Sequence, residues 1–247
     1  MDRYAGRVAL VTGASVGIGA AITQSLLRHG LTVVGLARRV DKVKALALKD
    51  APGKLYALEG DVSNEKSILA AFKWIKDNLK GVDILINNAG LVVESDLSSA
   101  PTESWKRMLD VNVLGLCICT REAVQDMLSR GVDDGFIIHI SSLTAHLPAF
   151  GTETAMYSAT KHAVNVLLEG LRKDLVAKKS KIRVGAVSPG TVKTELLNNG
   201  KFWPKDLYDR APYMEPEDVA EAVVYMLSQH PRVQVHDIVL RPNGSAA

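Results

Sequence analysis

The chain has 247 residues, of which 47% are hydrophobic and 23% charged, and its formal net charge is +3. This composition is typical of a globular protein with a sizeable core, and the length suits one large α/β domain. The charges are interspersed, with no basic run and no interleaved aromatic residues, so no nucleic-acid surface is expected.

Short apolar runs alternate with helical patterns along the whole sequence. In chain order we expect a strand at 7–12, a helix at 17–29, a strand at 32–36, a helix at 40–49, a strand at 54–58 and a helix at 64–80. These are followed by a strand at 82–87, a helical stretch at 101–130, a strand at 136–140, a helix at 155–178, a strand at 182–187, a helix at 217–228 and a strand at 237–240. Continuously apolar strands that alternate with helices predict a parallel sheet covered on both faces. We therefore expect one domain over residues 1–247.

A glycine-rich turn directly follows the first expected strand. Gly13, Gly17 and Gly19 lie in the sequence Thr-Gly-Ala-Ser-Val-Gly-Ile-Gly at 12–19, together with Ser15 and Ile18. Glycines let the backbone approach a pyrophosphate at the positive N-terminus of a helix, so the turn predicts a dinucleotide site. A turn without a ligand is the alternative, and the position at the first strand–helix junction favours binding.

Tyr157 and Lys161 are four residues apart in an expected helix and project from the same face. An ammonium about 5 Å from a phenol stabilises the phenolate by roughly 3 kcal/mol at an effective dielectric constant of about 20. We therefore expect the pKa of Tyr157 to fall by roughly two units, from about 10 towards neutrality. The pair is a candidate proton-transfer catalyst, and two solvent-facing side chains on a surface helix are the alternative.

These motifs and several others together resemble the short-chain dehydrogenase/reductase family. The others are Asn-Asn-Ala-Gly at 87–90, Asn112, Ser142 and Pro189-Gly190, and the set spans nearly the whole chain in the family's order. The resemblance implies an oxidoreductase with a single-domain Rossmann-type three-layer α/β sandwich and a seven-stranded, mostly parallel sheet. It also implies that the helical stretches at 101–130 and 155–178 assemble the protein as a homodimer or homotetramer.

The residues after the second expected strand indicate which cofactor binds. NAD-binding relatives have an acidic residue at this strand end, which grips the adenosine ribose diol. Here the positions hold Ala37, Arg38 and Arg39. Guanidinium groups suit a 2′-phosphate dianion, so we predict NADP(H), with Arg38 as the better candidate contact. Two arginines that only solvate a strand end are the alternative.

The resemblance implies further cofactor contacts. Asp61 and Val62 match the pair that holds the adenine, and capping of the helix near Asn64 is a second possible role for Asp61. The other implied cofactor residues are Asn88, Ala89, Gly90, Tyr157, Lys161, Pro189, Gly190, Val192 and Thr194.

The resemblance also implies four catalytic residues, which are Asn112, Ser142, Tyr157 and Lys161. Tyr157 would exchange a proton with the substrate oxygen, coupled to hydride transfer, and Ser142 would stabilise the developing charge. Lys161 would lower the pKa of the tyrosine and bind the nicotinamide ribose, and Asn112 would hold a water that links Lys161 to solvent. Strand-end capping and a helix kink are the alternative roles of Ser142 and Asn112.

Two positions depart from the family pattern. Ser142 precedes Tyr157 by 15 residues, which is slightly longer than usual, and it is preferred to Ser141 because it matches the second serine of the motif. His139 stands where the family often has Asn, and we expect it to be structural, with a titration that would perturb the sheet near the site.

The segments expected around the substrate are apolar and include a lid at about 192–215. Candidate substrate contacts are Ser142, Leu143, Leu147, Tyr157, Leu196 and Trp203. An apolar pocket suits a terpenoid alcohol such as farnesol, a long aliphatic alcohol or a ketosteroid, although several of these residues could only pack the lid. Residues 118–123, 157–161 and 215–223 are similar to insect farnesol dehydrogenase-like enzymes and to their vertebrate NADP-dependent ketosteroid and carbonyl reductase relatives. A non-catalytic NADP-binding sensor is the alternative from another class, and the complete catalytic set argues against it.

The remaining features bear on location and metals. No apolar run approaches the roughly 18 residues of a membrane span, and the expected first strand leaves no room for a signal peptide. Cys117 and Cys119 lie two apart on an expected helix and are interpreted as reduced core residues, so we expect a cytoplasmic protein. The six histidines show no metal-ligand spacing, and no metal site is expected.

Overall fold

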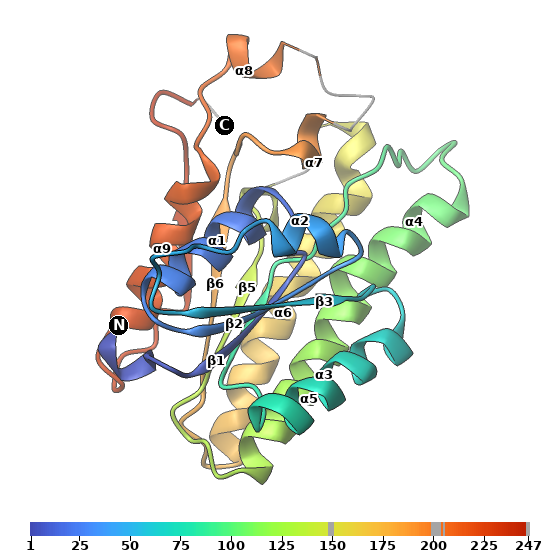
Figure 1. Cartoon of the computed structure of the whole chain (residues 1–247). Coiled ribbons are helices and arrows are strands. Elements are labelled where there is room, and N and C mark those ends of the chain that lie inside the picture. The colour runs from blue at the N-terminus through green and yellow to red at the C-terminus, as the bar shows by residue number, and fades with distance from the viewer. Residues whose placement is uncertain (148–150, 199–203, 205, 246–247) are drawn as a thin grey trace.

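A seven-stranded parallel sheet lies at the centre of the computed structural model, which describes residues 1–147, 151–198, 204 and 206–245 (Figure 1). The strands are β1 (Val8–Thr12), β2 (Thr32–Ala37), β3 (Lys54–Glu59), β4 (Ile84–Asn87), β5 (Phe136–Ile140), β6 (Arg183–Pro189) and β7 (Asp237–Leu240). Their order is β3-β2-β1-β4-β5-β6-β7, and every pairing between neighbours is parallel. The predicted Rossmann-type α/β fold is confirmed, with a sheet that is parallel throughout.

Helices cover both faces of this sheet (Figure 1). The helices α1 (Gly17–Arg28), α2 (Val40–Lys44) and α9 (Pro216–Ser228) contribute to one core, and α3 (Glu65–Leu79), α5 (Leu116–Ser129) and α6 (Ala155–Ala177) contribute to the other. In β1, Ala9 and Val11 enter the first core while Val8 and Leu10 enter the second. Successive side chains of a strand point to opposite faces, so a strand buried on both faces reads as one continuous apolar run.

The predicted helical stretch at 101–130 contains a π-helical turn. It consists of α4 (Thr102–Leu109), a π-helix at Asp110–Gly115 and α5. The wide turn brings Gly115 against the backbone of Val62, where a Cβ atom would lie 2.4 Å from the carbonyl oxygen. It also places Asn112 inside the protein, 2% exposed.

The predicted helix at 40–49 is shorter than expected and ends at Lys44. The chain continues in tight turns, with hydrogen bonds from Leu46 N to Val43 O and from Ala47 N to Lys44 O.

Because the strands are parallel, their carboxyl ends meet at one edge of the sheet. The strand order reverses between β1 and β4, which is where open α/β sheets form a binding crevice. The short helices α7 (Glu195–Asn198) and α8 (Leu207–Arg210) lie beyond this edge (Figure 1). In the described part of the chain, no helix combines the length and the apolar character that a membrane crossing requires.

Candidate active site

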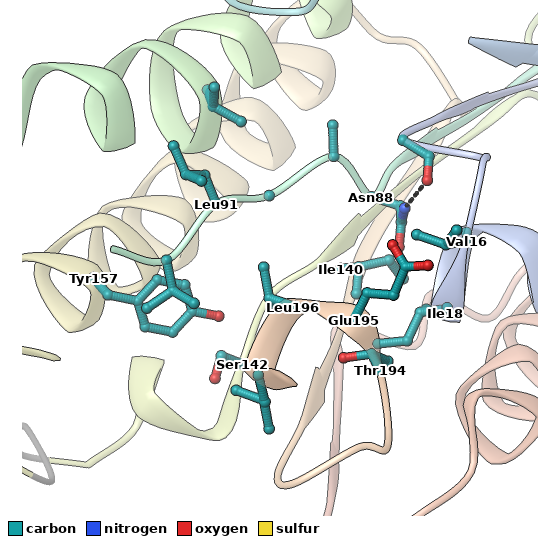
Figure 2. A pocket seen from close by; sticks show the side chains of 18 of the residues that line it. Val16, Ile18, Asn88, Leu91, Ile140, Ser142, Tyr157, Thr194, Glu195 and Leu196 are labelled. Carbon is teal, nitrogen blue, oxygen red and sulfur yellow. Dashed lines mark hydrogen bonds between the residues drawn. The ribbon is translucent and has the colours of Figure 1, made fainter. Parts of the chain in front are cut away.

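A cavity of about 670 Å³ follows the carboxyl edge of the sheet. Figure 2 shows Tyr157 and Ser142 at one end, Val16, Ile18 and Glu195 at the other, and Leu196 between them. The predicted site residues on its wall are Gly13, Ser15, Gly17, Ile18, Gly19, Arg38, Arg39, Asp61, Val62, Asn88, Ala89, Gly90, Ser142, Leu143, Tyr157, Lys161, Pro189, Gly190, Val192, Thr194 and Leu196. The structure thus gathers most of the predicted site in one place.

Three predicted residues are not on this wall. Asn112 lies behind it, and Leu147 is not among the lining residues, so its predicted substrate contact is not supported. Trp203 lies outside the described residues.

The glycine-rich turn is shaped by its neighbours as well as by its own dihedral angles. Gly13 and Gly17 have φ angles of 66° and 56°, which side chains rarely adopt. A Cβ atom on Gly13 would lie 2.8 Å from the Cα of Ala89, and one on Gly19 would lie 2.4 Å from Nδ2 of Asn88. Larger residues at these positions would push the segment at 88–90 away from β1.

The start of α1 can accept an anion. Its N-cap, Val16, makes no side-chain capping hydrogen bond, and residues 16–19 line the cavity. The first N–H groups of a helix have no partner within the helix and carry partial positive charge. The donor set at this turn therefore fits a dinucleotide pyrophosphate.

Thr12 holds the Asn-Asn-Ala-Gly segment in place, a role that the sequence did not reveal. Its Oγ1 accepts hydrogen bonds from the backbone N–H groups of Asn88 and Ala89, both at 3.1 Å. In return, Asn88 Nδ2 donates to Thr12 O at 2.9 Å and to Gly13 O at 3.2 Å. This network fixes the loop after β4 to the end of β1 and keeps both on the cavity wall.

Ser142 and Tyr157 lie close together at the other end of the cavity (Figure 2). Ser142 is the N-cap of a short 3₁₀ turn at Leu143–Ala145, and its Oγ accepts hydrogen bonds from Thr144 N at 3.2 Å and Thr144 Oγ1 at 3.0 Å. The capping role suggested by the sequence is therefore real. It fixes the Ser142 hydroxyl beside that of Tyr157.

Lys161 is buried one helical turn after Tyr157. Its Nζ donates to the carbonyl oxygen of Ile140 at 3.0 Å and lies 5.7 Å from the centre of the Tyr157 ring. Burial lowers the pKa of Lys161 from 10.5 to about 8 because it disfavours the ammonium.

The predicted fall in the pKa of Tyr157 is wrong for this structure. Burial raises that pKa to about 12, and the hydrogen bond with Ser142 lowers it only in part. The attraction of Lys161 favours the phenolate, but desolvation penalises both the phenolate and the ammonium. The ammonium donates a hydrogen bond to Ile140 O and lies 5.7 Å from the centre of the phenol ring.

Asn112 fastens the loop after β4 to helix α6. Its Nδ2 donates to Leu91 O at 2.9 Å and to Thr160 Oγ1 at 3.0 Å, and its Oδ1 accepts from Leu91 N at 2.8 Å. A Cβ atom on Gly90 would lie 3.8 Å from this Oδ1 and 3.9 Å from Lys161 Nζ, so the two groups flank one glycine. The side chain thus has the structural role that the sequence left open.

His139 is a buried residue of β5 and pairs with Asn87 of β4. It is 1% exposed, and its Nδ1 lies 3.2 Å from Nδ2 of Asn87. Burial, and then the charge of Lys161, lower its pKa to about 4. The ring is therefore neutral near pH 7, which agrees with a structural role.

Paired charged side chains lie at the opposite end of the cavity, where Arg39 and Glu195 line the wall. Arg39 Nη1 lies 2.8 Å from Oε2 of Glu195, and Lys42 Nζ lies 2.9 Å from its Oε1. Arg39 Nη2 is also 3.5 Å from Ser15 Oγ. The sequence did not predict Glu195 or Lys42, because the carboxylate is 156 residues away from Arg39 in the chain.

Asp61 lies near Arg38 on the same wall. Burial alone would raise the pKa of Asp61, but hydrogen bonds from Ser63 and the charge of Arg38 lower it overall. The helix that follows is capped by Asn64, whose side chain accepts from Ser67 N. The alternative capping role of Asp61 is therefore wrong, and its carboxylate instead holds Ser63.

The catalytic end of the cavity has a mostly apolar wall. Its apolar residues include Leu91, Val92, Val93, Leu143, Leu196 and Leu197, and the charged residues Glu103, Arg107 and Asp110 also line the cavity. Tyr208 packs behind the wall and accepts a hydrogen bond from Thr194 N at 3.2 Å. In the part of the chain that the structure covers, no group of three or more His, Cys, Asp or Glu residues could hold a metal ion.

Comparisons with known proteins agree with this geometry. The model of the short chain dehydrogenase family matches residues 7–204. A dehydrogenase/reductase SDR family member 11 from Bos taurus is 48% identical, and a farnesol dehydrogenase from Aedes aegypti is 43% identical; the matches cover 98% and 99% of this chain and the same shares of the relatives. The closed form of a serine dehydrogenase complexed with NADP+ superposes with a TM-score of 0.84 at 31% identity, covering 94% of this chain and 93% of that one.

Proposed function

The chain belongs to the short-chain dehydrogenase family of oxidoreductases, and from this premise we propose that it interconverts an apolar alcohol and its aldehyde or ketone with NADP(H). The observation that carries the proposal is the single cavity with Ser142 and Tyr157 at one end and Arg38 and Arg39 on its wall. A terpenoid alcohol such as farnesol is the first candidate substrate.

The residues fit the proposed cofactor along the length of the cavity. The uncapped start of α1 would receive the pyrophosphate, and Arg38 and Arg39 the 2′-phosphate. Asp61 and Val62 would contact the adenine, and Lys161 the nicotinamide ribose. When bound, the cofactor supplies the carbon that accepts or gives the hydride. The serine dehydrogenase neighbour, which is complexed with NADP+, supports this assignment.

Tyr157 would transfer the proton. With a pKa of about 12 its hydroxyl carries a proton near neutral pH, so it is ready to donate to a carbonyl oxygen. Ser142 holds the same oxygen and stabilises the charge that develops on it. In the oxidation direction the same step runs in reverse, and the phenolate form of Tyr157 takes the alcohol proton. Asn112 would hold a water beside Lys161, through which the proton reaches solvent.

The relatives suggest two substrate classes. One of them is a farnesol dehydrogenase, and the more similar one is named only as a dehydrogenase/reductase. The second candidate function is therefore reduction of a ketosteroid or another carbonyl compound. A protonated Tyr157 is in the form that donates to a carbonyl oxygen. A non-catalytic sensor is a poorer candidate, because it would not need Ser142, Tyr157 and Lys161 around one cavity.

We also propose a cytoplasmic homodimer or homotetramer. Leu114, Val166 and Val176 are 52%, 73% and 63% exposed on the helical segments predicted to assemble the protein. Apolar side chains on neighbouring surface helices suit an interface between copies of the chain.

A substrate panel tests the proposal. Purified protein would be mixed with farnesol, geraniol, citral, hydroxysteroids and diketones, each with NADP(H) and with NAD(H), while nicotinamide absorbance is followed. We expect turnover of an apolar alcohol or carbonyl compound with the phosphorylated cofactor preferred. A protein that turns over none of these compounds and binds neither cofactor would refute the proposal.

A further inference from the structure

One carboxylate joins two separate elements at the charged end of the cavity. Glu195 is the first residue of α7, whereas Arg39 follows β2 and Lys42 lies in α2. Each carboxylate oxygen meets one cation, at 2.8 Å for Arg39 and 2.9 Å for Lys42. Arg39 and Glu195 both line the cavity, and Figure 2 shows Glu195 close to Ile18 and Thr194.

We propose that Glu195 sets the cofactor selectivity of this site, because its carboxylate occupies the cations that a 2′-phosphate would otherwise use. The inference rests on the proposed function. A guanidinium group binds a carboxylate and a phosphate through the same N–H donors. Arg39 Nη1 already donates to Glu195, so a 2′-phosphate must displace the carboxylate or bind beside a like charge.

The competition is specific for the phosphate. A cofactor that lacks the 2′-phosphate leaves the contacts of Glu195 with Arg39 and Lys42 in place. A phosphorylated cofactor must replace these contacts with contacts to its 2′-phosphate. Glu195 therefore reduces the preference for NADP(H) over NAD(H) that the cations Arg38, Arg39 and Lys42 would otherwise give. The pairs of Lys42 and Arg39 lower the pKa of Glu195, which keeps its carboxylate charged near neutral pH.

The exchange is feasible because these ion pairs are partly open to solvent. The side chains of Arg39, Lys42 and Glu195 are 49%, 47% and 41% exposed. Exposed pairs contribute little stability and are screened by salt, so a dianion can displace the carboxylate. The competitor therefore weakens phosphate binding without preventing it. Lys42 becomes a third candidate phosphate contact, in addition to the two arginines.

Binding of nucleotide fragments tests this inference without any turnover. Isothermal titration would measure 2′,5′-ADP, which carries the 2′-phosphate, and 5′-AMP, which lacks it. Glu195→Gln keeps the side-chain shape and removes the charge. We expect it to bind 2′,5′-ADP about three- to tenfold more tightly than wild type does. Its affinity for 5′-AMP should stay within about twofold.

Asp77→Asn is the matched control, because it removes the same charge from another partly exposed ion pair. Asp77 pairs with Lys73 at 2.7 Å on α3 and does not line the cavity. This variant should bind both fragments as wild type does. An equal gain for 2′,5′-ADP in both variants would show a general effect of net charge and overturn the inference.

Lys42 provides a second, independent measurement. If Glu195 occupies Lys42, then Lys42→Met should cost little binding of 2′,5′-ADP in wild type and about threefold more in the Glu195→Gln background. Additive effects of the two substitutions would overturn the competition. Equal changes for both fragments on Glu195→Gln would also overturn it, since the carboxylate would then act on the whole nucleotide.

The same data separate this inference from the proposed function. If wild type prefers 2′,5′-ADP and Glu195→Gln shows no gain in affinity for it, only the role of Glu195 is refuted. A preference that appears only in Glu195→Gln would support it. Wild type and variant that both bind the two fragments equally would refute NADP(H) as the cofactor and the role of Glu195 together.

Discussion

The two ends of the cavity differ in how their charged groups are controlled. At the catalytic end Lys161 and His139 are 5% and 1% exposed, and burial is the largest cause of their pKa shifts. At the opposite end Arg39, Lys42 and Glu195 remain almost half exposed and are held by one another. Desolvation therefore determines the protonation of the groups at the catalytic end, and ion pairing holds the side chains at the charged end.

Because of this difference, the catalytic end should respond to substitutions that change packing, and the charged end to ligands and salt. Desolvated groups are tuned by packing, so substitutions there should change proton affinity and folding stability. Exposed ion pairs are weak and screened, so they can exchange partners when a ligand arrives. The site thus combines a fixed proton-transfer centre with an exchangeable anion-binding surface.

The strongest test of the fixed end is Tyr157→Phe. The variant keeps the ring but removes the hydroxyl that faces the cavity, so turnover should fall by about 10²- to 10⁴-fold in both directions. Affinity for NADPH should change by less than about threefold, since the ring still fills its place. Initial rates and a titration of nicotinamide fluorescence would measure the two effects. Turnover within about tenfold of wild type would contradict the assignment of the proton donor.

The second test uses the buried histidine at the same end. His139 has a pKa of about 4 in the folded protein, against 6.5 unfolded, so the unfolded chain binds more protons between these values. Its contribution to stability is fully present above pH 6.5 and is lost as the pH falls towards 4. The loss should reach about 3 kcal/mol.

His139→Asn should remove this component, because asparagine does not titrate there and can still bond to Asn87. Urea unfolding at several pH values from 4 to 7.5 would show a shallower loss of stability in the variant. The values at pH 7.5 serve as the reference, so any packing change cancels from the slope. Parallel slopes for the two proteins would show that His139 keeps a nearly normal pKa.

Much of the fold and of the candidate site follows from local sequence. The strands are continuous apolar runs because both faces of the sheet are covered, and a run of this kind is readable without coordinates. The glycines of the turn at 12–19 were predictable for a similar reason, since their roles depend on backbone conformation and on close approach of the loop after β4. Their spacing along the chain carries that information.

The features that the sequence does not predict correctly depend on the three-dimensional surroundings of the residues. The distance between Tyr157 and Lys161 predicts a lowered pKa for the tyrosine, but burial raises that pKa. The π-helical turn at Asp110–Gly115 arises from packing against the Val62 backbone and has no periodic signature. The partner of Arg39 comes from a segment distant in sequence. Helix periodicity and motif spacing describe neither solvent exclusion nor such pairings.

The third test has a smaller expected effect than the first two and concerns the charged end of the cavity. Arg38 lines the wall beside Asp61, and Arg38→Ala removes one of the proposed phosphate contacts. We expect NADPH to bind about tenfold more weakly at low salt, because a charge-assisted hydrogen bond contributes roughly 1.5 kcal/mol. NADH binding should be almost unchanged. The loss should shrink at high salt, since the contact is near solvent and is screened.

Arg28→Ala serves as the control for Arg38→Ala, because Arg28 is an exposed arginine of α1 that does not line the cavity. Titrations of both cofactors at two salt concentrations would give the required comparison. Equal weakening of NADPH and NADH in Arg38→Ala would remove the phosphate assignment. If the loss of NADPH affinity does not depend on salt, Arg38 acts as a desolvated group, and the two ends of the cavity do not differ in the way described.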